Sequence, residues 1–560
     1  MAAFPSTTST APLSRPFWHT FPGLLVSGGL IALTLAGLGA LIWQARQPDI
    51  SELWNSPYLR NVIAFTLRQA VISTAISLAL GLLVALALLR QSAFPGRKAL
   101  LRIMELSLVL PTIVAVSGLV ACYGREATVT QWLGHWLSYE WNLYGINGIV
   151  LAHVFFNAPL AGRILLQSLE SVPAPRRRVA SQLGLRGWWH WRAVDWPAIR
   201  PVLPGVGALV FTLCFTSFAI IMTLGGGPGA TTLEVAIYQA LRFEFDFGQA
   251  AMLAVVQLII CGLLWVFMVR GDFSANLSPQ RSFSGAIPRP NCGTAHRVTD
   301  RLLLLAFSLF LLLPLIAILA RGLPSLAEVV FGDGKALQQL IAASLRSFSI
   351  ALPAGAFSVA TALAILGLGT IRIPALKRLS NLTPAIPLMV PPIVLGTGLF
   401  LLLRPGLGDA SQGLALVALI NGLMALPFTL QLLKEPFRGL DRASLNLADQ
   451  LGILGWYRWR WLHWPRMRAP LSLAMAYGTG LSLGDFGVIA LFGSPAQPTL
   501  PVLLYQQMGS YRVELAAATA LWLVASLFLV FIGFNALGRS GAPSGTKQLS
   551  LERLAEMRHA

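Results

Sequence analysis

Long apolar stretches alternate with shorter polar segments along almost the whole chain. A bilayer core about 30 Å thick is crossed by roughly 20 apolar residues in a helix, so these stretches predict membrane-spanning helices. The pattern therefore predicts an all-α membrane protein with about twelve transmembrane helices. They are expected near residues 22–43, 61–90, 103–122, 143–166, 203–224, 249–270, 302–320, 340–369, 383–403, 412–433, 470–492 and 515–537.

Composition and charge support the same class. Hydrophobic residues make up 55% of the chain, charged residues only 11%, and the mean hydropathy is +0.68. The formal charge of +19 could indicate a nucleic-acid partner. However, most of the 41 Lys and Arg residues fall in loops that share one side of the membrane when the N-terminus is cytoplasmic. That distribution predicts a membrane protein with both termini in the cytoplasm and no nucleic-acid partner.

One polar loop occurs twice, once in each half of the chain. Each copy carries Gln-Leu-Gly followed by Trp-Pro, within residues 182–197 and 450–465. Apolar segments repeat as well, because residues 111–118 match residues 391–398. The chain is therefore expected to contain two related halves.

The boundaries of these halves follow from the spans. We expect a first six-span repeat at residues 1–270 and a second at residues 301–538, followed by a cytoplasmic tail at 539–560. Residues 271–300, which contain several Pro, Ser and Gly, are expected to link the repeats. Since six spans separate equivalent points, both halves run in the same direction through the membrane, with a pseudo-twofold axis along its normal.

The repeated loop has the features of a docking surface. Ala180 and Leu183 are three residues apart and are expected to share one face of a short helix, as are Ala448 and Leu451. The glycine that follows each pair accepts a positive φ and permits a sharp turn. Several Trp and Arg residues come next, so the loop could alternatively serve only as an anchor at the membrane interface.

These residues resemble the permease subunits of ATP-binding cassette importers, whose signature loop carries Glu-Ala-Ala and then Leu-Gly. The resemblance implies the type I importer permease fold. It also implies that each loop is a coupling helix docked on an ATPase subunit. The acidic position is occupied by Arg178 and Asn446 here, which puts any salt bridge from that position in doubt. The docking residues implied are Arg178, Ala180, Leu183, Gly184, Asn446, Ala448, Leu451 and Gly452.

Longer strings narrow the resemblance to the fused permeases of bacterial thiamine importers. They include Thr-Leu-Gly-Gly-Gly-Pro at 223–228, Ser-Leu-Gly-Asp-Phe-Gly at 482–487 and Leu-Tyr-Gln-Gln-Met at 504–508. The resemblance implies transport of thiamine or its phosphates, delivered by a periplasmic binding protein and driven by two ATPase subunits. An iron(III) importer permease of the same layout is the alternative cargo assignment.

No energy-converting site is evident in the sequence. The glycine-rich segment at 225–229 does not match a P-loop, which requires Gly-x-x-x-x-Gly-Lys followed by Ser or Thr. We therefore expect no catalytic residues, no metal and no cofactor in this chain, with ATP and Mg used by a partner ATPase. A twelve-span secondary transporter is the alternative class, but it would have no partner for the repeated loops.

Candidate residues of the translocation path or its gate lie near span ends. Asp485 and Phe486 form a carboxylate and aromatic pair, which suits a cationic aromatic cargo. Pro111 and Pro391 break the helices of the third and ninth spans, as a wall that must rearrange requires. Gly225 begins the glycine-rich segment on the outer side, where it is expected to form a tight turn or contact the binding protein.

Overall fold

Helices make up the computed structural model, and no strand occurs in the residues that it describes. The described residues are 21–45, 56–91, 94–124, 127, 130, 131, 135, 142–270, 294–368, 376, 383, 390–403, 410–438, 448, 450–453, 457 and 459–539. Eight of their helices are long and apolar enough to cross a membrane, or up to ten if each of two bent pairs counts as one span.

The first half carries a nearly complete series of helices up to residue 270. They are α1 (Phe21–Gln44), α3 (Pro57–Arg90), α4 (Arg97–Val109), α5 (Thr112–Tyr123), α7 (Ile146–Glu170), α8 (Ala174–Gln182), α9 (Gly187–His190), η2 (Trp191–Asp195), α10 (Trp196–Ile199), α11 (Leu203–Phe215), α12 (Phe218–Leu224), η3 (Pro228–Ala230), α13 (Leu233–Gln239), η4 (Ala240–Glu244) and α14 (Phe247–Arg270).

The second half repeats much of this order. Its described helices are α15 (Thr294–Phe331), α16 (Gly334–Leu368), α19 (Pro392–Leu403), α20 (Ala410–Arg438), η8 (Trp459–His463), α23 (Trp464–Leu483), α24 (Gly487–Phe492), α25 (Leu500–Gly509) and α26 (Val513–Arg539). Helix α15 begins at Thr294, so the end of the segment expected as a linker is helical. The π-helices η2 and η8 occupy the same place in the repeat, since each ends immediately before a Trp-Pro pair.

The first helix of each half packs on the last helix of its own half, α1 on α14 and α15 on α26, and also reaches the other half. Helix α1 packs against α16 and α19, whereas α15 packs against α3, α4 and α5. Glycines permit two equivalent close approaches: a Cβ built on Gly118 of α5 would lie 2.7 Å from the carbonyl oxygen of Pro314, and its repeat partner Gly398 of α19 lies against Gly37 of α1. These contacts fasten the halves together at equivalent places.

Within the described residues, three of the expected spans are interrupted. Helices α4 and α5 meet at an angle of 116° around Pro111, which has no amide hydrogen to continue a helix. The span expected at 203–224 is divided into α11 and α12, and the one expected at 470–492 into α23 and α24. These two breaks are equivalent in the repeat, and they bring non-helical backbone into the membrane region.

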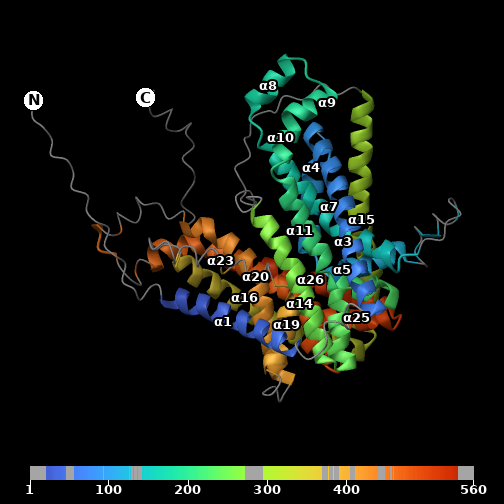
Figure 1. The fold of residues 1–560 in the computed structure, drawn as a ribbon, viewed down its shortest axis with the longest axis vertical. Coiled ribbons are helices and arrows are strands. Elements are labelled where there is room, and N and C mark those ends of the chain that lie inside the picture. The colour runs from blue at the N-terminus through green and yellow to red at the C-terminus, as the bar shows by residue number, and fades with distance from the viewer. Residues whose placement is uncertain are drawn as a thin grey trace, which may run out of the picture.

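The helices form two arms (Figure 1). One arm contains α3, α7, α11 and α15 and ends at α8, while the other contains α1, α16, α20 and α23 and points in a different direction. The arms meet near α5, α14, α19 and α25. Helix α8, from the repeated loop, therefore lies far from the region where the arms join.

Candidate functional site

The first repeated loop forms the short helix α8 at the end of one arm. Its outward face carries Arg178 and Val179, and Leu183 follows directly after the helix; the side chains of Val179 and Leu183 are 53% and 70% exposed. Exposed apolar residues beside a cationic one at a helix surface are suited to a protein contact rather than to structural packing.

Ala180 does not belong to that outward face. It is 4% exposed and packs beneath α8 against Val172 and Val194. The expectation that Ala180 and Leu183 present one common face is therefore wrong, because the helix ends at Gln182 and Leu183 lies in the turn that follows. Ala180 therefore packs the helix against the rest of the protein, whereas the side chain of Leu183 is exposed to solvent.

Both loops turn at the expected glycines. Gly184 has a φ of +68° and Gly452 a φ of +64°, a conformation that residues with a Cβ rarely adopt. The amide of Leu185 donates to the carbonyl of Ala180 at 3.0 Å, and in the second loop Ile453 donates to Ala448 at 2.9 Å. These are equivalent C-terminal helix caps.

The second loop matches the first wherever the structure describes it. Ala448 is 5% exposed, so it is buried like Ala180, and Leu451 is 64% exposed. Asn446, the counterpart of Arg178, lies outside the described residues. The displayed leucine and the turn that follows are thus present in both halves.

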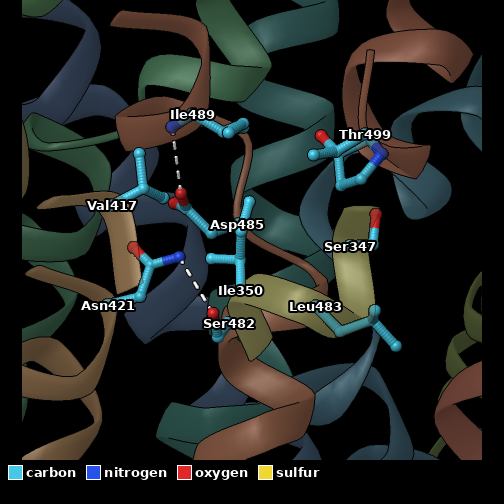
Figure 2. A pocket seen from close by; sticks show the side chains of 10 residues that line it. Ser347, Ile350, Val417, Asn421, Ser482, Leu483, Asp485, Ile489 and Thr499 are labelled. Atoms are coloured by element: carbon cyan, nitrogen blue, oxygen red, sulfur yellow. Dashed lines mark hydrogen bonds between the residues drawn. The ribbon is translucent and has the colours of Figure 1, made fainter. Parts of the chain in front are cut away.

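The break between α23 and α24 lies where the two halves meet. A Cβ built on Gly484 would lie 3.1 Å from the Cβ and Cγ of Pro111, which belongs to the first half. Asp485 follows, and its carboxylate accepts a hydrogen bond from the amide of Ile489 at 3.4 Å (Figure 2). Pro111, which is distant in the sequence, therefore lies beside the segment that carries Asp485 and Phe486.

Four aromatic rings close this site, and we name them the aromatic quartet: Phe218, Tyr238, Phe486 and Tyr505. Phe218 and Phe486 stack across the two halves with ring centroids 5.6 Å apart. Tyr238 contacts Phe218 at 5.3 Å, and Tyr505 contacts Phe486 at 4.9 Å. The members are repeat partners in the sequence, so each half contributes one Phe and one Tyr to the quartet.

Buried polar groups surround the quartet in both halves. In the first half, the ring nitrogens of His153 lie 3.0 Å from the Ser73 hydroxyl and 2.7 Å from the Ser217 hydroxyl. In the second half, Asn421 donates to Ser482 at 3.1 Å (Figure 2). Asn421, Ser482 and Asp485 also line a cavity of about 10 Å³, room for about one water molecule.

Pro391 and Gly225, the other two candidate gate residues, are not among the aromatic quartet or the residues that line the cavity. Pro391 is buried immediately before α19, which packs against α24 just as α5 packs against α12. Gly225 is buried at the end of α12, and the positive φ values of the turn occur at Gly226 and Gly227 instead. The predicted turn is therefore present, but the residues that adopt a positive φ in it are Gly226 and Gly227 and not Gly225.

Sequence reasoning missed His153, Ser217 and Phe218. A signal was available in the repeat. When the two loops are aligned at Gly184 and Gly452, the positions matching the missed residues hold Asn421, Asp485 and Phe486. Comparing the halves position by position therefore pairs these residues from the sequence alone.

Comparisons with known proteins agree with this architecture. A family model described as the binding-protein-dependent transport system inner membrane component matches residues 77–273. The chain is 40% identical over 523 residues to the thiamine transport system permease protein ThiP of Escherichia coli (strain K12), covering 92% of this chain and 96% of that protein.

Two further relatives show how the similarity extends. The thiamine transport system permease protein ThiP of Haemophilus influenzae is 38% identical over 520 residues, covering 91% of this chain and 93% of that protein. The sulfate transport system permease protein CysT of Escherichia coli is 27% identical over 263 residues, covering 45% of this chain but 92% of that protein. Nearly the whole of the latter protein therefore aligns with less than half of this chain.

Proposed function

The chain belongs to the family of thiamine transport system permease proteins, integral components of the bacterial inner membrane, and we propose that it forms the translocation path for thiamine or its phosphates. Similarity over 92% of the chain to a named thiamine permease is the observation that carries this cargo. A periplasmic binding protein delivers the cargo on the outer side.

ATP hydrolysis takes place in two copies of a separate ATPase subunit, one for each repeated loop. The displayed residues of α8 and the matching exposed Leu451 support two equivalent docking sites. Arg178 and Asn446 would contact the ATPase at equivalent positions, and Gly184 and Gly452 shape the turns beside them. The loops and both termini lie in the cytoplasm, in keeping with the many Arg residues in both loops.

The chain itself supplies neither a cofactor nor a catalytic group. ATP and Mg are used by the ATPase subunits. Movement of the two docking loops changes the angle between the arms, and membrane lipid surrounds the apolar outer faces of their helices.

The aromatic quartet and Pro111 form the gate of the path. Discontinuous transmembrane helices are a frequent setting for transport sites, because their free backbone groups can face a passage. The stack of Phe218 on Phe486 closes the passage between halves, and it opens when α12 and α24 separate. Asp485 places a carboxylate beside a route taken by a cation.

Uptake of radiolabelled thiamine at nanomolar concentration tests the cargo. The cells lack thiamine synthesis, retain the neighbouring ATPase, and carry or lack this chain. Loss of uptake on deletion, with recovery on re-expression, supports thiamine. Unchanged thiamine uptake would overturn that assignment, and iron(III) would then be the cargo to test with the same strains.

A further inference from the structure

A buried cluster of charged side chains lies behind the first docking helix. The guanidinium of Arg177 is 3% exposed and donates to the carbonyl of Leu169 at 2.5 Å. Its other terminal nitrogen lies 3.8 Å from the carboxylate of Asp195. His190 approaches the second oxygen of that carboxylate at 3.2 Å. The cluster ties α8 to the end of α7 and to the π-helix η2.

Burial makes this connection sensitive to the loss of either partner. Burial lowers the pKa of Arg177, whereas the charges of Asp195 and Glu170 oppose that shift. Asp195 is only 7% exposed. Removing one member of a buried pair leaves an uncompensated charge, which is more damaging than replacing both members by apolar groups.

A second ion pair extends the connection toward the gate. Glu170, at the end of α7, accepts from Arg97 at 2.7 Å, and Arg97 is the first residue of α4. Helix α4 leads to Pro111, which packs against Gly484 in the gate. Docking helix, α7 and α4 are therefore joined by charged contacts, and α4 ends at the gate.

The second half lacks the residues for an equivalent cluster. At the matching positions of the second repeat, Leu445 replaces Arg177, His463 replaces Asp195 and Arg438 replaces Glu170. No arginine and carboxylate pair can form from these three residues. The two docking loops share their turn and their displayed leucine, but only the first contains this charged set.

We propose that Arg177 is a positioning residue that makes the first docking loop move as one body with α7, η2 and α4, so that this loop drives the gate more directly than the second. The inference rests on the proposed docking role of the loops. Arg177 itself contributes little to the contact with the ATPase, because its side chain points away from the displayed face.

The test compares variants of the full complex reconstituted with its ATPase and binding protein. Arg177→Met removes the charge, and Arg177→Met with Asp195→Leu replaces the whole pair by apolar side chains. Leu445→Met is the matched control in the second loop. For each variant we would measure ATPase recovery in a pull-down, ATP hydrolysis, and thiamine transported per ATP hydrolysed.

We expect both Arg177 variants to recover the ATPase at the level of the unmodified protein, and thiamine transported per ATP to fall about tenfold. Leu445→Met should leave that ratio unchanged. If Arg177→Met fails to assemble, the double variant still carries the test, because it leaves no unpaired buried charge. An unchanged ratio in the double variant would show that the cluster serves folding alone.

A different experimental result would show that the docking assignment itself is wrong. Gly184→Asp alters the displayed surface without touching the buried cluster, since nothing lies within 4 Å of the position of its Cβ. If Gly184→Asp and Gly452→Asp together leave ATPase recovery unchanged, the loops are not the docking sites. In that case the effect of Arg177→Met must have another origin, and the positioning role is overturned with it.

Discussion

At the breaks in the two equivalent spans, different residues accept hydrogen bonds from the free amides of the short helix that follows. In each half a short helix, α12 or α24, begins inside the protein and exposes amide groups that need an acceptor. In the second half Asp485, two residues before the start of α24, accepts from Ile489. In the first half Ser217 holds that position and contacts His153, while the carboxylate of Glu234 accepts from the amide of Phe218.

Comparing the two breaks shows which residue types are the same in both halves and which differ. Both breaks carry a phenylalanine, Phe218 in the first half and Phe486 in the second. The acidic group lies in the break itself in the second half, whereas in the first half it comes from α13. Glu234 is also held by the amide of Gln257 at 3.0 Å. The two halves therefore contribute the same aromatic residues to the proposed gate, and they place its acidic groups differently.

The docking loops share their turn and their exposed leucine in both halves, and altering both turns should have the largest effect. Replacing Gly184 and Gly452 by Asp places a charged side chain on each turn at positive φ, which Asp tolerates better than most residues. We expect an inserted protein that loses nearly all ATPase recovery in a pull-down. Each single variant should retain partial recovery, and full recovery by the double variant would contradict docking through these turns.

The next largest effect is expected from a substitution at Gly484, compared with one at its repeat position Thr216. In Gly484→Val the new side chain would collide with Pro111, since even a Cβ would lie only 3.1 Å away. Overpacking of this kind costs about 1–3 kcal/mol, so we expect at least a tenfold loss of thiamine uptake. The matched variant is Thr216→Val, at the repeat position that already carries a branched side chain. Equal losses for the two variants would show that contact with Pro111 is unimportant.

Removing the acceptor of α24 should have a moderate effect. Asp485→Ala leaves the first amides of α24 without that carboxylate, a loss of about 1 kcal/mol for a helix cap, and it removes the charge from the path. We expect uptake to fall roughly fivefold, because both effects act at the gate. Ser217→Ala in the first half should cost less, since Glu234 still accepts from Phe218. A larger loss for Ser217→Ala, measured in the same uptake assay, would reverse the comparison.

The smallest effects are expected at the symmetric stack. Phe218→Leu and Phe486→Leu each remove one ring of the same pair, worth about 0.5–1.5 kcal/mol beyond the area that it buries. We expect both variants to raise ATP hydrolysis without cargo by a similar factor of about two to three, because leucine keeps part of the contact and the closure is only weakened. A clear difference between the two variants would mean that the gate is not symmetric.

Much of the fold could be predicted because its signals are local or periodic. Apolar length predicts spans such as α3 and α16, and the proline at 111 predicts the bend between α4 and α5. The turns at Gly184 and Gly452 follow from the absence of a Cβ, which only the residue type decides. The repeat, visible in matched residues around these two glycines, indicated two equivalent loops.

The site was predicted only in part. Asp485 and Phe486 were identified as a carboxylate and aromatic pair, but their stacking and packing partners lie elsewhere in the chain, in Phe218 and Pro111. Spacing in the docking helix suggested that Ala180 and Leu183 share a face, yet the helix ends between them and Ala180 is buried. A helical periodicity cannot reveal where the helix stops or which side another segment covers.

By itself, the sequence determined the membrane class, the two related halves, the paired loops and the family, since each depends on residue type at fixed spacing. Only the tertiary structure decided that α1 and α15 each pack against helices of the other half, that Phe218 meets Phe486, and that Arg177 is buried against Asp195. These contacts arise from how apolar helices pack around one another. Packing depends on the shapes of surfaces that are distant in sequence, and no local pattern encodes it.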